Sequence, residues 1–310
     1  MIQFKGLLKI PILLALSCSQ NHILPKVVKI NHFPSASGIE YFNNNIYVIG
    51  DDANYILILD SNLNAVDSIP LYNFDGTRIT KAFKADLESA GIISNNKKTG
   101  LFLAGSGSLP NRNTGWLIDP STRQKDSIRL DTFYNLLQLK GLDEINIEGV
   151  CSLPGKMILA NRGNKSWPHN FLVITNEHFW TDQSHATASI IRVGANTDSS
   201  TFQGVSGLAY ASGSDRLILS VSTENTHSSV DDGVIGKSFL WIIENISSKL
   251  KWEGINPNKI IDLGKIDNRF KGEKIESVCI TKENKDFIYL VLAADNDEGS
   301  STLFKMILKK

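Results

Sequence analysis

The sequence predicts an all-β fold, a five-bladed β-propeller formed by a single domain. Three observations support this prediction: a short motif that recurs five times, strand-like runs after each copy, and a strand that is missing at one end of the chain but present at the other. The motif is a small polar or acidic residue, then Gly or Ser, then an apolar residue. Its copies are Ser37-Gly38-Ile39, Glu88-Ser89-Ala90, Glu148-Gly149-Val150, Ser206-Gly207-Leu208 and Glu276-Ser277-Val278. A motif that returns at intervals of 51 to 70 residues indicates a repeat architecture.

Short runs rich in β-branched and aromatic residues follow each copy and are bounded by turn-forming residues, which indicates consecutive antiparallel strands. After the first motif the runs are 46–49, 55–59 and 65–71, and after the second they are 101–104, 115–118 and 126–130. The third unit has 157–160, 171–174 and 188–193, and the fourth has 217–221, 239–243 and 259–263. The fifth has only 287–293 and 302–308 before the chain stops.

The strand missing from the fifth unit is found at the start of the chain, where residues 25–30 precede the first motif and belong to no unit. Pairing the two would close the ring and leave no open sheet edge. A six-bladed ring is the alternative if 132–143 or 246–258 contains a weak extra sheet. We expect one propeller domain over residues 18–310.

The first 17 residues resemble a signal peptide, with Lys5 and Lys9 before an apolar stretch that is too short to span a bilayer. Leu14 to Cys18 resembles the lipobox of bacterial lipoproteins, in which the cysteine carries the lipid. We therefore expect a lipoprotein of the cell envelope, periplasmic or on the outer surface, that meets the membrane only through Cys18. Plain secretion is the alternative.

The other two cysteines and the net charge argue against three features: a disulfide, a cysteine metal site and a nucleic-acid partner. Cys151 and Cys279 occupy equivalent positions after two motifs, so we expect buried core residues and not a disulfide or a metal pair. The 32 Lys and Arg balance the 32 Asp and Glu, which argues against a nucleic-acid polymer as partner. A monomer is expected.

In a propeller the first strand of each blade lines the central channel, so the first motif residues should converge there. They are Ser37, Glu88, Glu148, Ser206 and Glu276. Three carboxylates in a narrow channel raise one another's pKa unless a counter-charge is present. Calcium accepts six to eight oxygen ligands, whereas zinc prefers His or Cys, so the motif favours calcium. The alternative is that these residues are hydrated channel-lining groups without a metal.

The order Ser, Glu, Glu, Ser, Glu resembles the calcium-activated nucleotidase (apyrase) family of five-bladed propellers, in which side chains of this order hold a central calcium. The runs 46–52 and 81–86 are also similar to segments of that family, and by this similarity Asp86 is an alternative to Glu88 as the ligand of the second blade. Phytase-like and strictosidine-synthase-like propellers, which carry similar Glu-Gly segments, are more distant resemblances. The resemblance implies a calcium-dependent phosphohydrolase.

Polar residues follow the second strand of each unit, and we expect them at the rim opposite the motif loops, where a rigid scaffold commonly places a site. Candidate catalytic residues are Asp51, Asp52, Arg162 and Glu224, and candidate substrate-binding residues are Arg112, Lys165 and Trp167. Ser222 stands where the apyrase pattern has a basic residue before Glu224.

Two classes of function follow from this pattern. The first is metal-assisted hydrolysis of a phosphoanhydride or phosphate ester, with Arg stabilising the developing charge. The second is a non-enzymatic surface module that binds a glycan, peptide or protein, since propellers host many functions.

Overall fold

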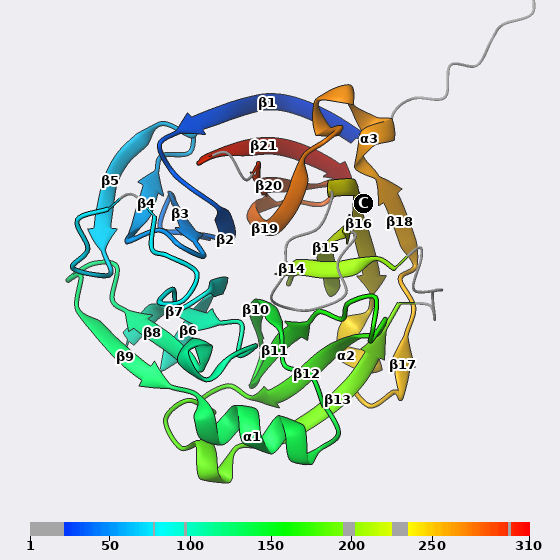
Figure 1. Cartoon of the computed structure of the whole chain (residues 1–310). Helices are drawn as coiled ribbons and strands as arrows, with labels where there is room; N and C mark the ends of the chain where they lie inside the picture. Colours follow the sequence, from blue (N-terminus) through cyan, green and yellow to red (C-terminus); the bar gives the residue numbers. More distant parts are fainter. Residues whose placement is uncertain (1–21, 77, 96–97, 195–201, 225–234, 297–298) are drawn as a thin grey trace, which may run out of the picture.

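The computed structural model describes residues 22–76, 78–95, 98–194, 202–224, 235–296 and 299–310. Five sheets, antiparallel apart from one added short strand, surround a central axis, so the prediction of a five-bladed β-propeller is confirmed (Figure 1). The blades are numbered here in the order of their motifs. The innermost strand of each begins at the motif.

Blade 1 contains β2 (Ala36–Phe42), β3 (Asn45–Gly50), β4 (Tyr55–Leu59) and β5 (Ala65–Pro70). Blade 2 contains β6 (Leu87–Asn95), β7 (Lys98–Gly105), β8 (Thr114–Ile118) and β9 (Lys125–Arg129). Blade 3 contains β10 (Ile147–Leu153), β11 (Lys156–Asn161), β12 (Asn170–Asn176) and β13 (Ala188–Val193), with the short β17 (Gly254–Ile255) added parallel to β13. Blade 4 contains β14 (Gly204–Ala211), β15 (Arg216–Glu224), β16 (Ile235–Glu244) and β18 (Lys259–Asp262).

Blade 5 joins the two ends of the described chain. Its strands are β19 (Lys274–Glu283), β20 (Phe287–Asp295), β21 (Ser300–Lys309) and β1 (His22–Asn31). Strand β1 pairs antiparallel with β21, placing Val28 opposite Leu303, so the predicted ring closure by residues 25–30 is confirmed. Figure 1 shows β1 running along the outside of β21.

The helices are short and lie between the strands. They are α1 (Asp131–Leu139), α2 (Ile246–Lys249) and α3 (Leu263–Ile266), with 3₁₀ turns at Pro110–Arg112, Gln183–His185 and Asn268–Phe270. The segments that raised the six-bladed alternative contain α1, α2 and β17 and no further sheet. Within the described ranges, no helix is both long and apolar enough to span a membrane.

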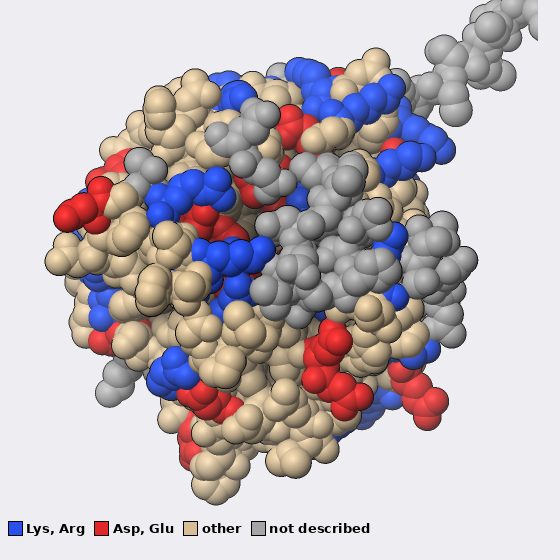
Figure 2. All heavy atoms as spheres, viewed as in Figure 1, with Lys and Arg blue, Asp and Glu red and all other residues tan. Residues whose placement is uncertain are grey.

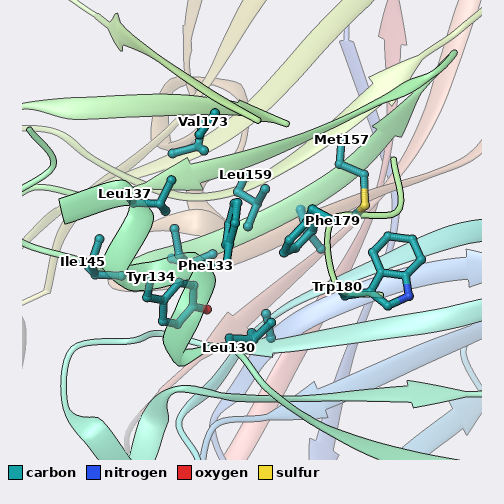
Figure 3. Packing of buried hydrophobic residues seen from close by; sticks show 14 of the residues in the cluster. Leu130, Phe133, Tyr134, Leu137, Ile145, Met157, Leu159, Val173, Phe179 and Trp180 are labelled. Carbon is teal, nitrogen blue, oxygen red and sulfur yellow. The ribbon is translucent and has the colours of Figure 1, made fainter. Parts of the chain in front are cut away.

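The core fills the spaces between neighbouring blades. Between blades 2 and 3, α1 inserts Phe133 against Phe179, whose ring centroids lie 4.2 Å apart, and Trp180 lies at the edge of this cluster (Figure 3). Cys151 packs between blades 3 and 4, and Cys279 packs between blades 5 and 1. Both are buried and unbonded, so the prediction that they are core residues is confirmed.

Candidate functional site: the channel mouth

All five first motif residues occupy the extra position of a β-bulge at the start of an innermost strand. In blade 1, for example, Ala36 pairs with Gly50 and Gly38 with Ile49, which leaves Ser37 without an opposite residue. The same shift in register leaves out the equivalent residue of every other blade: Glu88, Glu148, Ser206 and Glu276. A bulge redirects the side chain of its extra residue, and bulges are common beside functional sites.

Close approach of neighbouring strands explains the Gly or Ser that follows. A Cβ atom on Gly149 would lie 2.9 Å from the backbone nitrogen of Leu208, and one on Gly207 would lie 2.9 Å from the Cα atom of Ser277. The third motif residue is apolar because it is buried between blades, as Val150 and Leu208 are. The three motif residues therefore have different roles. The first faces the channel, the second allows neighbouring innermost strands to approach closely, and the third packs in the core between blades.

The prediction that the polar residues after the second strands lie at the rim opposite the motif residues is wrong. Because the first two strands of each blade are antiparallel, the start of the first lies beside the end of the second, as Leu87 lies opposite Gly105. The motif residues and the polar residues after the second strands therefore share one end of the channel. We call this end the channel mouth.

The two motif serines make equivalent hydrogen bonds. The Ser37 hydroxyl donates to the carbonyl oxygen of Leu87 at 2.5 Å, and the Ser206 hydroxyl donates to that of Ile275 at 2.6 Å. Each carbonyl belongs to the residue just before the motif glutamate of the next blade. A hydroxyl that donates its hydrogen still has oxygen lone pairs available to a further ligand.

The three motif glutamates each retain unused oxygen. Glu276 Oε1 accepts from Lys274 Nζ at 2.7 Å, while its buried Oε2 has no partner within the described residues. Glu148 Oε1 accepts from Asn146 Nδ2 at 2.7 Å and lies 3.6 Å from Arg162 Nη1, and its Oε2 has no hydrogen bond there. For Glu88, no hydrogen bond or ion pair to the carboxylate occurs in the same ranges.

Burial and mutual repulsion raise the pKa values of these carboxyls. Burial raises the pKa of Glu148 to about 7, with Arg162 opposing the shift and Glu276 adding to it. Burial, followed by the charges of Asp86 and Glu148, raises the pKa of Glu88 well above its ordinary value. The charge of Glu148 thus raises the pKa of Glu88, and the charge of Glu276 raises the pKa of Glu148.

Beside Glu88 there are more carboxylates than cations. Oxygens of Asp51, Asp86 and Glu88 lie within 4.8 Å of one another. Lys84 pairs with Asp51 and, at 2.8 Å, with Asp86, and the buried Arg112 pairs with Asp86 at 2.7 Å. Burial also raises the pKa of Asp51 to about 6 despite Lys84. Three carboxylates face two cations, and Glu88 is the one without a direct partner.

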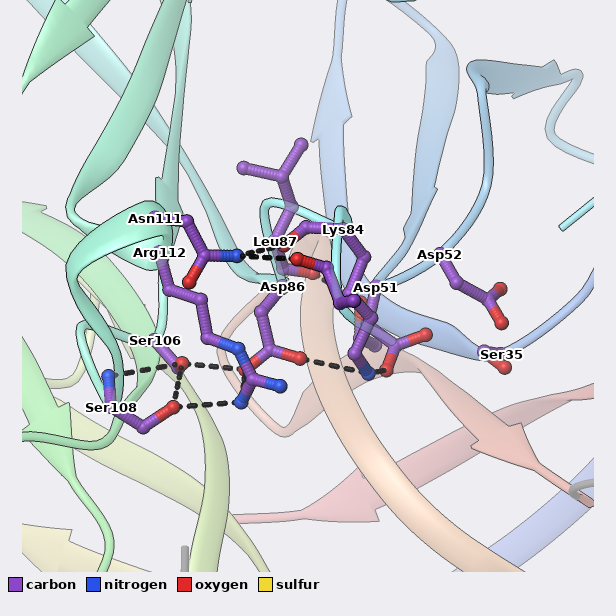
Figure 4. A network of polar contacts seen from close by, with 12 residues as sticks. Ser35, Asp51, Asp52, Lys84, Asp86, Leu87, Ser106, Ser108, Asn111 and Arg112 are labelled. Atoms are coloured by element: carbon purple, nitrogen blue, oxygen red, sulfur yellow. Dashed lines mark hydrogen bonds and ion pairs between the residues drawn. The ribbon is translucent and has the colours of Figure 1, made fainter. Parts of the chain in front are cut away.

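Figure 4 shows how Asp86 is held. Its Oδ2 accepts from the Ser106 hydroxyl at 2.5 Å as well as from Arg112, and Arg112 also donates to Ser108 at 2.8 Å. Arg112, a candidate substrate-binding residue, is only 2% exposed, and its guanidinium already pairs with Asp86. On Arg112, Nε and Nη2 are buried without hydrogen-bond partners in the described chain.

A second layer of residues lies two places before each motif, and the sequence reading missed it apart from Asp86. Its members are Ser35, Asp86, Asn146, Gly204 and Lys274. Ser35 accepts from Arg78, which also pairs with Asp52 at 2.6 Å. Two members of this layer, Ser35 of blade 1 and Asp86 of blade 2, have positive φ angles of 51° and 54°, which are uncommon for residues other than glycine. The sequence did contain a pattern that could have identified this layer, since a polar residue or Gly stands two positions before every motif.

Only some of the other predicted site residues lie at the channel mouth. Asp51, Asp52 and Arg162 lie at the mouth, and Figure 2 shows acidic side chains recessed near the centre of this face with basic ones on two sides. Lys165 is half-buried. Trp167 stacks on Phe171 at 5.0 Å between ring centroids, so it packs against blade 3. Glu224 ends β15, but its side chain, like Cys18 and residues 1–17, lies outside the described residues.

Comparison with known proteins adds the family and the fold. The profile of a family of unknown function, DUF6929, matches residues 32–308. No curated protein matches the chain. Among solved structures, glutaminyl cyclase of Myxococcus xanthus is 10% identical, with a TM-score of 0.50, covering 93% of this chain and 97% of its own. Virginiamycin B lyase of Staphylococcus aureus is 12% identical, with a TM-score of 0.39, covering 91% and 99%. At such identities the likeness shows the fold alone.

Proposed function

Because the chain belongs to the DUF6929 family, whose function is unknown, we propose a function from the channel mouth: the five motif residues bind a calcium ion. The observation that carries the proposal is that all five are oxygen donors at equivalent bulges and that each has lone pairs left. The buried, unpartnered Oε2 of Glu276 is one such donor.

The donor set fits a hard cation. Calcium prefers carboxylate, hydroxyl and carbonyl oxygens and tolerates irregular geometry. Glu88, Glu148 and Glu276 would supply carboxylate oxygens, and Ser37 and Ser206 would supply hydroxyl oxygens. Lys274, Arg162 and Asn146 already bind the other oxygen of their glutamates, so they would orient those carboxylates without displacing the metal. Bound calcium would stabilise the ionised form of Glu88.

Thermal unfolding in calcium and in chelator tests the metal site. We expect the melting temperature to rise with calcium, since a ligand present at 100 times its Kd stabilises by about 2.7 kcal/mol. Glu276→Gln should reduce this rise. Glu253→Gln, at an exposed residue beside β17 on the outer edge of blade 3, should not. Equal melting temperatures with calcium and chelator would rule out the site.

We further propose that the same mouth binds a small phosphate-bearing molecule and hydrolyses it. The supporting observation is the pair of buried guanidinium groups, Arg112 and Arg162, because Arg binds phosphate through two parallel hydrogen bonds. Asp51, whose pKa burial raises to about 6, would accept a proton from the attacking water. The charge of Arg162 would stabilise the phosphoryl oxygens.

Phosphate release from a panel of nucleotides and phosphate esters separates this activity from binding alone. Release that requires calcium and falls about 100-fold or more in Arg162→Ala would support hydrolysis. Binding of the same compounds without release would identify a non-enzymatic binding module, the second candidate. That alternative is favoured by the ion pairs that already engage each cation at the mouth.

A further inference from the structure

A separate cavity of about 120 Å³ lies between blades 2 and 3, away from the channel mouth. Strand β7 ends at the mouth, and the cavity is lined by residues at its opposite end, including Gly100, and by Ile118 at the end of β8. The cavity is therefore near the opposite rim and does not share the residues of the proposed calcium site.

The inner part of the cavity is apolar and aromatic. Ile93 and Ile118 are buried, and Trp180 of blade 3 is 7% exposed. Trp180 is fixed by Phe102, with ring centroids 5.5 Å apart. An engineered apolar cavity of about 150 Å³ takes up benzene, so this volume suits one small ring or a short aliphatic chain.

The outer part carries two negative charges that no cation of the described chain neutralises. Asp126 is exposed and its carboxylate makes no hydrogen bond or ion pair within the described residues, and Asp119 is half-buried. Hydrogen bonds from Ser121 and Thr122 lower the pKa of Asp119 to about 2, so it is ionised at neutral pH. The neighbouring Gln124 is exposed.

The cations of the same β-hairpin have partners elsewhere, and Arg129, at the far end of β9, pairs with Asp131. Arg123 pairs with Asp67 of blade 1, and Lys125 donates to the carbonyl oxygen of Pro70, also in blade 1. The two cations nearest the turn are therefore directed towards blade 1, and the negative charges of Asp119 and Asp126 remain at the cavity.

We infer that this cavity binds a small organic ammonium ion, with its apolar body against Trp180 and its charge beside Asp119 and Asp126. An aromatic face attracts a cation, and the two carboxylates provide the complementary charge. The same chemistry is present in a free amine and in a lysine side chain.

Ligand-observed NMR on the full chain tests this inference with three phenyl compounds of similar size and different charge: benzylamine, benzyl alcohol and benzoate. We expect a Kd of about 1 mM or tighter for benzylamine, given its small number of atoms. Benzyl alcohol should bind at least five-fold more weakly, on the order of one exposed charge interaction, and benzoate not measurably. Equal binding of benzylamine and benzyl alcohol, or no binding of benzylamine, would overturn the inference.

Matched variants locate the binding. Asp126→Asn should weaken benzylamine about three- to five-fold, because it removes one exposed charge. Asp286→Asn, at an exposed aspartate of blade 5, should have no effect. An unchanged Kd in Asp126→Asn would place the amine elsewhere and overturn the site. Nα-acetyl-lysine amide, which keeps the side-chain ammonium group, represents a lysine of a protein. Tighter binding of this compound than of benzylamine would identify a lysine side chain as the preferred ligand, and weaker binding would identify a free amine.

Discussion

The Arg162 side chain lies against Gly204. Gly204 is the only glycine among the five residues that stand two positions before the motifs. A Cβ atom on Gly204 would come within 2.4 Å of Arg162 Nε. Arg162 is thereby held across from Glu148, whose carboxylate it approaches to 3.6 Å. The glycine of blade 4 thus makes room for the cation that faces the glutamate of blade 3.

Gly204→Ala should displace Arg162 and raise the pKa of Glu148 above about 7, because Arg162 is the main charge that opposes the effect of burial. The free energy of unfolding should fall by about 1 to 3 kcal/mol, as is usual when a packed site is overfilled. Carboxyl carbon NMR against pH measures the first effect. The control is Gly254→Ala, where the nearest heavy atom to an added Cβ is 3.8 Å away.

Stability of the calcium-free protein should fall as pH rises from about 4.5 to about 7. The pKa of Glu148 is raised from 4.5 to about 7, so in this window the unfolded chain loses a proton that the folded protein keeps. The carboxyl therefore costs up to roughly 3 kcal/mol at the upper end. Asp51 acts in the same direction, up to about pH 6.

Denaturant unfolding in chelator at several pH values measures this fall. Glu148→Gln should reduce the slope, because the amide does not titrate, and should leave the part that comes from other buried carboxyls such as Asp51 and Glu40, whose pKa values burial also raises. A profile that keeps its full slope in Glu148→Gln would show that other carboxyls cause it.

Removal of β1 should destabilise the whole ring. A chain that begins at residue 32 leaves β21 as an unpaired edge and exposes the apolar surface that Val28 and Ile30 cover. We expect loss of cooperative unfolding and aggregation, measured by calorimetry and light scattering. The comparison chain begins at residue 22 and keeps β1, and equal behaviour of the two would contradict a closing role for this strand.

Cys18 provides a test of the predicted lipid anchor. Expression of the full chain in a bacterial host should give a membrane-associated product that carries a lipid at Cys18, and Cys18→Ser should yield unlipidated protein. Mass spectrometry of the N-terminal peptide distinguishes the two. An unmodified Cys18 in the mature product would exclude lipidation.

Much of the fold could be predicted because each motif combines three local requirements in three consecutive residues. The apolar residue at its third position and the small residue at its second are needed in every blade, so five copies revealed the blade number. The strand missing from the fifth unit then indicated the ring closure by residues 25–30. The first hairpin turn is also explained by local sequence, because its residues Asn43 and Asn44 have positive φ, which Asn tolerates better than most residues.

The site was less accessible to prediction because its partners are set by contacts between blades. Lys84 and Lys274 look like ordinary charged residues, yet each neutralises a buried carboxylate. Arg112 looks like an exposed loop residue, yet it is buried against Asp86.

The sequence alone specifies the oxygen donors Ser37, Glu88, Glu148, Ser206 and Glu276 and their order around the ring, because repetition is visible without coordinates. The antiparallel pairing within each blade then places the second-strand ends at the same mouth as these donors. Charge balance, too, depends on the folded chain. Only there do Arg112 and Asp86, 26 residues apart, and Lys84 and Asp51, 33 residues apart, form ion pairs, while Glu88 is left without a direct partner in the described chain. Electrostatic interactions depend on distance and burial, which no linear pattern records.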